Sequence, residues 1–146
     1  MLFHYTKMTE DVQRIIDQDP VRPHIPYYMR LNRNRYISGY GDPSNPGAVV
    51  CYSILDFVPQ SEHELFYDDN QEYDIACLYT IWSNEKGCAR KLVFEMLPYL
   101  KKEMGVKRVV TLSPTTDMAR RFHIGNGAFM HRDNEVVGTV NYEYWT

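Results

Sequence analysis

The chain has 146 residues, of which 24% are charged, and its formal net charge is only -3. This length fits one domain, residues 1–146, with a substantial core. The low net charge gives no electrostatic reason to expect nucleic-acid or membrane binding, and no apolar run approaches the ~20 residues of a membrane span.

The first residues and the cysteines bear on where the protein works. Residues 1–7 lack the apolar region of a signal peptide. The three cysteines have no metal-ligand spacing, and two of them lie in apolar, strand-like runs, which favours buried free thiols in a reducing compartment. We therefore expect a cytoplasmic protein and no metal site.

The first half of the chain predicts a short helix and an antiparallel group of strands. Thr9 is a plausible N-cap, and the apolar residues Val12, Ile15 and Ile16 then fall on one face of a helix that ends near Asp19. Residues 21–26 form a loop, and 27–32 form either a second short helix or an irregular segment. Strands are expected over 2–5, 35–40 and 48–58, with a turn-rich loop over 41–47.

The second half predicts alternating strands and helices after a polar connection at 60–72. A near-continuous apolar run over 74–82 is typical of a central strand covered on both faces. A long amphipathic helix follows Gly87 and stops at Gly105. A strand at 107–112, a helix capped by Thr115 or Thr116, and a final hairpin over 129–144 complete the chain. This order predicts a mixed α/β (α+β) sheet in which strands 74–82 and 107–112 are parallel and the others mostly antiparallel.

The residues between the central strand and the long helix form a candidate anion site. The segment Asn84-Glu85-Lys86-Gly87-Cys88-Ala89 ends a strand and opens a helix. Gly87 permits a tight turn, and the free N–H groups of the first helical turn, with the positive end of the helix dipole, attract anions. The segment has neither the two glycines and Lys-Ser/Thr of a Walker A loop nor a GxGxxG pattern.

This segment resembles the pyrophosphate loop of the GCN5-related N-acetyltransferases (GNAT), whose pattern is Gln/Arg-x-x-Gly-x-Gly/Ala. Asn84, Gly87 and Ala89 stand at its three defining positions. A second block at 116–129, Thr-Asp-Met-Ala-Arg-Arg-Phe-His and then Asn-Gly-Ala-Phe, is similar to the family's Asn-x-x-Ala-x-x-Phe/Leu-Tyr and glycine-phenylalanine pair. The chain departs from the pattern at Asn84, at Thr116, at His123 in place of tyrosine, and at the inserted Ala128.

The resemblance implies a GNAT-like fold whose central sheet splays open between two parallel strands, with acetyl-CoA lying in that V as co-substrate. Backbone groups of residues 78–81 would pair with the pantetheine arm, and residues 84–89 would hold the pyrophosphate. The residues implied to bind the coenzyme are Leu78, Tyr79, Thr80, Ile81, Asn84, Glu85, Lys86, Gly87, Cys88, Ala89, Arg90, Thr116, Ala119 and Phe122.

The implied reaction is attack of an amine on the thioester, which needs a base for the ammonium and an acid for the leaving thiolate. His123 stands where the family's acid tyrosine would be, although a surface or capping histidine is an equal alternative. Asp74 and Glu72 lie near the start of the central strand, where each is either a base or an ordinary solvated residue. Cys88 is more plausibly passive than reactive, despite its place at a helix N-terminus.

Three functions stay open from the sequence. The first is an N-acetyltransferase acting on a primary amine of a small molecule or peptide. The second is a non-catalytic protein of the same fold that binds CoA or a protein partner, and the third is an α/β protein whose anion loop is accidental. The apolar strands over 136–145 can pair across a homodimer.

Overall fold

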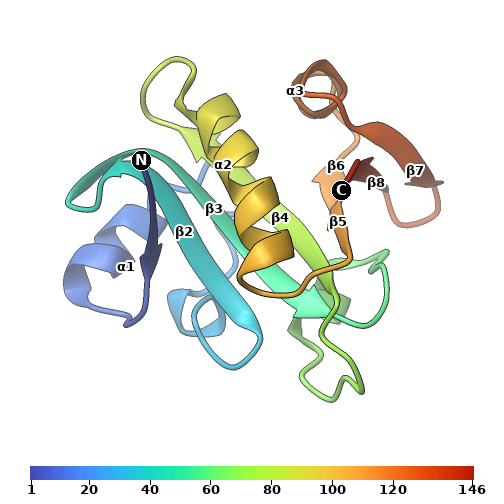
Figure 1. Ribbon diagram of the computed structural model, residues 1–146, viewed down its shortest axis with the longest axis horizontal. Helices are drawn as coiled ribbons and strands as arrows, with labels where there is room; N and C mark the ends of the chain where they lie inside the picture. The colour runs from blue at the N-terminus through green and yellow to red at the C-terminus, as the bar shows by residue number, and fades with distance from the viewer.

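The computed structural model describes residues 1–146 and builds them around one eight-stranded sheet of order β1-β2-β3-β4-β5-β8-β6, with β7 paired to β8 (Figure 1). The strands are β1 (Leu2–Tyr5), β2 (Arg35–Asp42), β3 (Asn45–Leu55), β4 (Ile75–Ser83), β5 (Arg108–Thr111), β6 (Ser113–Pro114), β7 (Phe129–Asn134) and β8 (Thr139–Tyr144). The helices are α1 (Glu10–Ile16), α2 (Cys88–Lys102) and α3 (Asp117–Gly125), and two 3-10 turns are η1 (Tyr27–Met29) and η2 (Glu62–Phe66).

The sheet is mixed, as predicted from the order of the elements. β4 and β5 are parallel and are joined by α2, whereas every other neighbouring pair is antiparallel. The predicted strand–helix–strand crossover is therefore confirmed.

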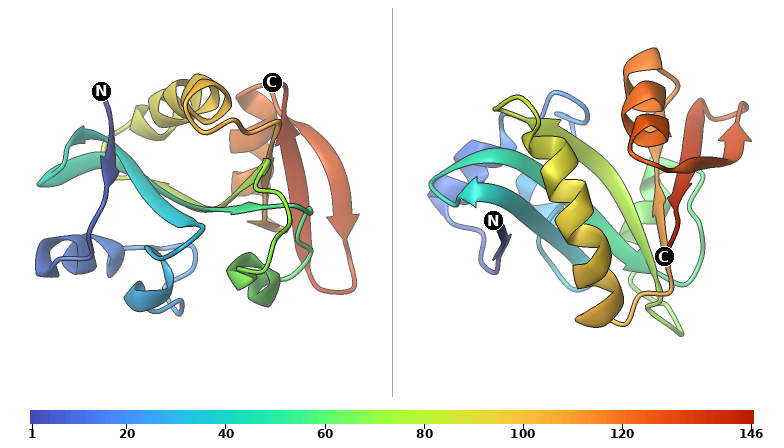
Figure 2. Two further views of the ribbon diagram at one scale, coloured as in Figure 1. Left: turned by 60° about the horizontal axis from the view of Figure 1, so that its bottom comes forward. Right: turned by 45° about the horizontal axis from the view of Figure 1, so that its top comes forward.

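Two apolar cores cover the two faces of the sheet. On one face α2 buries its predicted stripe, including Leu92, Met96 and Leu100, against β3, β4 and β8. On the other face Val12 and Ile16 of α1 pack with residues of η2, β3 and β4. Figure 2 shows α2 above the sheet and α1, η1 and η2 below it. Any ligand that reaches β4 therefore meets a different set of side chains from each face.

Several boundaries differ from the prediction for local reasons. α1 ends at Ile16 and is followed by tight turns, in which the N–H groups of Gln18 and Asp19 donate to the Ile15 and Ile16 carbonyls. The Asp19 carboxylate then accepts from the N–H groups of Val21 and Arg22. The β2–β3 hairpin is tighter than the predicted 41–47 loop, because the strands extend to Asp42 and from Asn45. The predicted 107–112 strand is observed as β5, and Ser113 and Pro114 form a further short strand, β6; both strands pair with β8.

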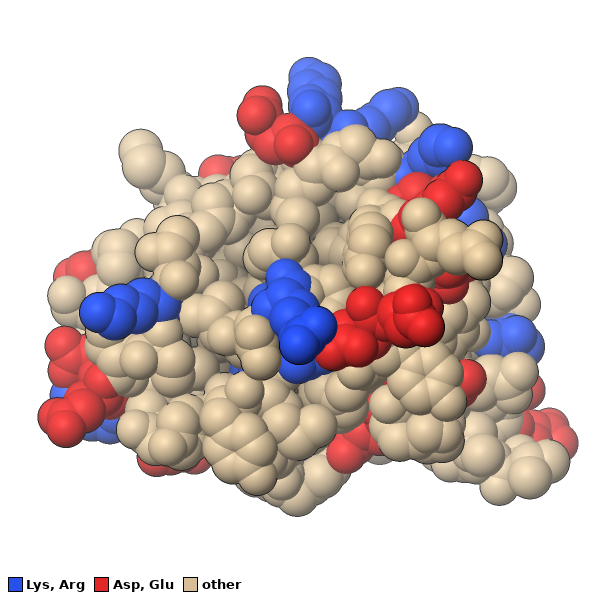
Figure 3. All heavy atoms as spheres, turned by 90° about the horizontal axis from the view of Figure 1, so that it is seen from below, with Lys and Arg blue, Asp and Glu red and all other residues tan.

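The surface carries no dominant charge on the face shown in Figure 3, where acidic and basic side chains are interspersed among uncharged ones. None of the helices has both the length and the apolar character needed to cross a bilayer.

Candidate functional site

The β4–β5 pairing stops halfway along β4. The parallel register runs from Ile75–Arg108 to Leu78–Thr111, and a last bond joins Leu112 N–H to the Leu78 carbonyl at 3.0 Å. Residues 79–83 then continue along β3 without β5. Tyr79 is an extra residue in the β3–β4 ladder, between the paired positions Cys51–Thr80 and Tyr52–Leu78. Such a bulge bends a strand and redirects its backbone groups, so β4 diverges from β5 at this point.

The loop after β4 is anchored to the start of β3. The N–H groups of Asn84 and Glu85 both donate to the Gly47 carbonyl, at 2.7 and 3.1 Å, and the Asn84 side chain donates to the Pro46 carbonyl at 3.1 Å. A Cβ atom on Gly47 would lie 2.7 Å from the Cys88 sulfur, so the close approach of hairpin and loop requires glycine here. The Asn84 side chain is therefore used to hold the loop in place.

The helix that follows begins with four free donors. Gly87 caps α2 with φ of 83°, a left-handed conformation that glycine adopts without strain. The N–H groups of Lys86, Gly87, Ala89 and Arg90 have no acceptor within the protein. Because α2 has fifteen residues, its dipole adds a partial positive charge at the same place. The start of α2 thus has unpaired donors at the position where the sequence predicts an anion site.

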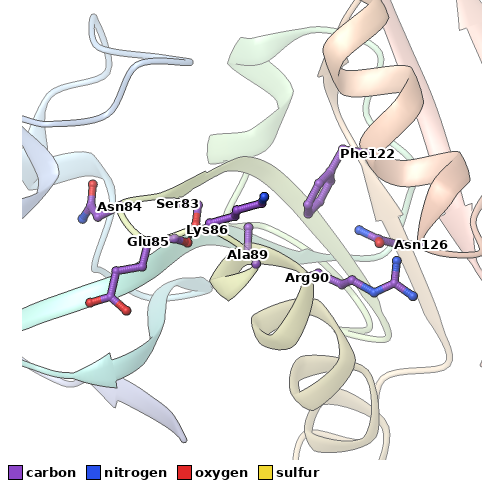
Figure 4. A pocket seen from close by; sticks show the side chains of 9 residues that line it. Ser83, Asn84, Glu85, Lys86, Ala89, Arg90, Phe122 and Asn126 are labelled. Atoms are coloured by element: carbon purple, nitrogen blue, oxygen red, sulfur yellow. Dashed lines mark hydrogen bonds between the residues drawn. The ribbon is translucent and has the colours of Figure 1, made fainter.

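A hollow of about 410 Å³ adjoins these donors. Figure 4 shows Lys86 and Ala89 on one side of it and Phe122 and Asn126, at the end of α3, on the other, with Arg90 extending from α2 toward Asn126. The lining residues are Ser83, Asn84, Glu85, Lys86, Gly87, Ala89, Arg90, Phe122 and Asn126. The side chains of Asn84 and Glu85 point away from Phe122 and Asn126, so the Glu85 carboxylate does not oppose an anion there.

Two lining residues were not identified from the sequence. Ser83 and Asn126 line the hollow, and the Asn126 side-chain nitrogen is buried without an acceptor. Asn126 lies within the second family-like block, in the break between two glycines, where its side chain drew no separate prediction. An unsatisfied amide beside a hollow is a further donor for a polar ligand.

A buried arginine occupies the other face of the sheet where β4 and β5 diverge. Arg22 follows α1, and its Nε donates to the Tyr79 carbonyl while its Nη2 donates to the Leu112 carbonyl, each at 2.8 Å. These carbonyls belong to the two diverging chain segments. The Arg22 guanidinium thus bridges them just beyond the last β4–β5 hydrogen bond.

Two partly exposed side chains continue this group toward solvent. Arg22 Nη1 lies 2.7 Å from Glu62 Oε2, and His24 Nε2 lies 2.7 Å from Glu62 Oε1. We call Arg22, Glu62 and His24 the Arg22 cluster. Asp19 helps to hold this cluster against β4, because its carboxylate accepts from the Arg22 N–H at 3.0 Å and from the Thr80 hydroxyl at 2.9 Å. The cluster was not predicted from the sequence, because its members lie far apart, in a loop and in a polar connection.

Comparisons with known proteins agree with this geometry. No family model matches the sequence, and no curated protein matches it. Among solved structures, malonyl-CoA decarboxylase from Agrobacterium vitis superposes with a TM-score of 0.79 at 17% identity, over 100% of this chain and 60% of that one. PaiA N-acetyltransferase from Thermoplasma acidophilum, in complex with coenzyme A, gives 0.65 at 11% identity, over 100% and 99%. The chain has the GNAT fold.

A third solved structure extends the range of chemistry found on this fold. The GNAT-like decarboxylase GphF, in complex with isobutyryl-CoA, superposes with a TM-score of 0.72 at 12% identity, over 99% of this chain and 98% of that one. The GNAT fold of this chain is therefore shared with both acetyltransferases and decarboxylases. The chain spans about 60% of the length of the malonyl-CoA decarboxylase chain that it matches.

The residues that the GNAT resemblance assigns to the coenzyme are brought together in part. Residues 84–90 and Phe122 surround the hollow, except that Cys88 is buried behind it. Thr116 does not line it and instead caps α3, where its hydroxyl accepts from the Ala119 N–H at 3.2 Å. In the 78–81 segment, the Leu78 and Tyr79 carbonyls are already bonded, to Leu112 N–H and to Arg22.

His123, the expected general acid, lies in the core and not in the groove of the GNAT fold. It is 4% exposed, its Nδ1 lies 2.7 Å from the Tyr144 hydroxyl, and its ring stacks on Tyr142. Burial lowers the pKa of His123 to about 4, so the ring is neutral near pH 7. We correct the prediction accordingly: His123 has no imidazolium proton to give to a thiolate.

Asp74 and Glu72, the expected bases, lie at the wrong end of β4. The Asp74 carbonyl accepts from the N–H groups of Lys107 and Arg108, where β4 and β5 begin side by side. Tyr79 lies five residues further on, which at about 3.3 Å per residue is roughly 16 Å away. The structure therefore does not bring either carboxylate to the point where the strands diverge, and neither is retained as the base.

Proposed function

We propose that this chain binds acetyl-CoA and transfers its acetyl group to a primary amine of a small molecule or peptide. The observation that carries the proposal is the set of four unpaired N–H groups at the start of α2, beside the hollow of about 410 Å³. A pyrophosphate has several acceptor oxygens and a negative charge. Its oxygens can accept hydrogen bonds from these N–H groups, and its charge is attracted by the positive end of the helix dipole. Arg90 and Lys86 add charge-assisted contacts at the rim.

The place of the reaction follows from the direction of β4 and from the end of its pairing with β5. With its pyrophosphate at residues 86–90, the arm runs back along β4 toward Tyr79, where β5 no longer occupies that edge. Its thioester then lies at the divergence of the strands, and an amine approaches from the face that carries the Arg22 cluster. Holding both reactants in this geometry replaces a collision in solution by an intramolecular step, which supplies much of the rate.

Calorimetric titration of the protein with acetyl-CoA tests the binding step. Ala89→Asp places a carboxylate beside the free N–H groups, and we expect it to weaken binding at least tenfold. Met118→Asp, a change to an 82% exposed residue on α3 that does not line the hollow, is the matched control and should bind like the wild type. Absence of heat and of a thermal shift with the wild type would refute coenzyme binding altogether.

A second candidate is decarboxylation of an acyl-CoA that carries a carboxylate on its acyl chain. The observation in its favour is the cationic Arg22 at the strand divergence, since a guanidinium suits a carboxylate. Two of the three structural neighbours described above are decarboxylases. Incubation with malonyl-CoA, followed by mass spectrometry for acetyl-CoA, separates this reaction from acetyl transfer, which is detected as free thiol released in the presence of an amine.

A chain that binds CoA but gives neither product would be a non-catalytic protein of the GNAT fold. The substitutions at Asn84, Thr116 and His123 relative to the family pattern are the features that favour this outcome. The two activity assays and the titration together therefore separate all three functions.

A further inference from the structure

One carboxylate lies at the strand divergence with access to solvent. Glu62 is the first residue of η2, and a capping box formed by Ser61 and Glu64 fixes the start of that turn. The side chain of Glu62 is 33% exposed and that of His24 is 60% exposed, whereas that of Arg22 is only 10% exposed. The Arg22 cluster thus runs from the buried edge of β4 out to bulk water.

The bonds of this carboxylate set its position. Glu62 Oε2 is 2.7 Å from Arg22 Nη1, and His24 Nε2 is within 2.8 Å of both Glu62 oxygens. Arg22 is fixed in turn by the carbonyls of Tyr79 and Leu112. A single guanidinium group, that of Arg22, therefore links the Glu62 carboxylate to the diverging strands.

The other acidic groups near this point are committed elsewhere. Asp19 is buried in an ion pair with Arg30, with a side-chain exposure of 0%. Glu64 accepts from the N–H groups of Gln60 and Ser61 as part of the capping box. Glu62 is the acidic group of this neighbourhood that is both fixed toward the strand divergence and open to solvent.

We infer that Glu62 takes the proton from the acceptor ammonium, directly or through one water, and that His24 passes this proton to solvent. Arg22 is the positioning residue that holds Glu62 below the strand divergence. The inference rests on the proposed acetyl transfer, and it assigns the base of that reaction to the connection between β3 and β4. No sequence pattern marked this segment.

The proton balance of the step is complete. The ammonium loses one proton to Glu62, and its nitrogen lone pair then forms the bond to the thioester carbonyl carbon. The carbon–sulfur bond breaks with its electron pair on sulfur, and the second nitrogen proton ends on the leaving thiolate. The products are the amide, free CoA thiol and one proton released to solvent through His24.

The test compares acceptors that need a base with acceptors that do not. Alkylamines are protonated at pH 7, whereas alkoxyamines are neutral there and need no proton removed before attack. We expect Glu62→Gln to lower kcat/KM for alkylamines about 100-fold, the usual contribution of a general base, and to leave alkoxyamines within about threefold. His24→Gln, a change at an exposed side chain, should lower kcat/KM about tenfold for alkylamines alone.

Two controls distinguish chemistry from structure. Glu72→Gln removes a carboxylate from the same connection but at the far end of β4, and it should leave both classes of amine unchanged. The acetyl-CoA dissociation constant of each variant should stay within about twofold of the wild-type value, which reports an intact fold. Arg22→Lys should follow Glu62→Gln in its selective loss for alkylamines.

The outcomes separate this inference from the proposed function. No thiol release by the wild type with either class of amine would overturn both. An active wild type with an unchanged Glu62→Gln variant, or with equal losses for alkylamines and alkoxyamines, would overturn the assignment of Glu62 while acetyl transfer stands. A loss confined to alkylamines in both the Glu62 and His24 variants supports it.

Discussion

The buried ion pair between Asp19 and Arg30 should govern the stability of the loop that carries Arg22. Both side chains have an exposure of 0%, and their closest atoms are 2.7 Å apart. Asp19 also accepts from the Val21 and Arg22 N–H groups and from the Thr80 hydroxyl. Asp19→Ala leaves an uncompensated buried guanidinium, which costs about 3–5 kcal/mol, a large part of the ~5–15 kcal/mol by which domains are stable.

Urea unfolding followed by tryptophan fluorescence measures this loss, and a double-mutant cycle tests its origin. Arg30→Met should cost a similar amount, and the double variant should cost about 2–3 kcal/mol less than the two single losses together, because it leaves no unpaired charge. Asp11→Ala breaks an ion pair whose side chains are 68% and 80% exposed, and should cost less than about 1 kcal/mol. A loss below about 1 kcal/mol for Asp19→Ala would contradict the argument.

Three further predictions concern His123, the start of β3 and the loop before α2. The pKa of His123 falls from 6.5 to about 4 on folding, so the unfolded chain binds a proton first as the pH drops. Wild-type stability should therefore fall by about 3 kcal/mol between pH 6.5 and 4. His123→Leu should reduce this fall in urea melts at a series of pH values. Gly47→Ala puts a Cβ 2.7 Å from the Cys88 sulfur, so it should cost about 1–3 kcal/mol and weaken acetyl-CoA binding by calorimetry. Adding Cys88→Ala removes the sulfur but leaves a Cβ at 3.2 Å, so it should restore part of both losses. In Gly87→Ala the added Cβ would have no atom within 4 Å, but alanine would be forced to adopt a φ of 83°. The free energy of unfolding should therefore fall by about 1–2 kcal/mol in thermal melts. A smaller loss would mean that the turn relaxes.

The fold was predictable because its signals are local. A near-continuous apolar run marked β4 and helical periodicity marked α2. Glycine or threonine at the ends of α2 and α3 marked their boundaries. Thr9 and Thr116 cap their helices as predicted, by accepting from Val12 and Ala119 N–H. Those residues act through neighbours within a turn, so a single sequence contains the whole interaction.

The site was predictable only where one continuous segment builds it. The loop 84–90 shows its donors in its own sequence, whereas the Arg22 cluster joins residues 40 positions apart through contacts that exist only after β3 and β4 have paired. His123 failed as the acid for a related reason. Its position in the family-like block was visible, but the Tyr142 and Tyr144 rings that bury it come from β8, at the other end of a hairpin.

The charge of Arg22 also bears on which of the two proposed reactions this site suits. Decarboxylation disperses the negative charge of the substrate carboxylate, so a firm ion pair to a guanidinium stabilises the ground state more than the transition state and slows the reaction. In this chain the Glu62 carboxylate already forms an ion pair with Arg22, which leaves less positive potential for the carboxylate of a substrate. An amine needs no cation at this place, and the Glu62 carboxylate is positioned to accept its proton. The pairing of Arg22 with Glu62 therefore favours acetyl transfer over decarboxylation, and Glu62→Gln should shift the balance toward binding of malonyl-CoA.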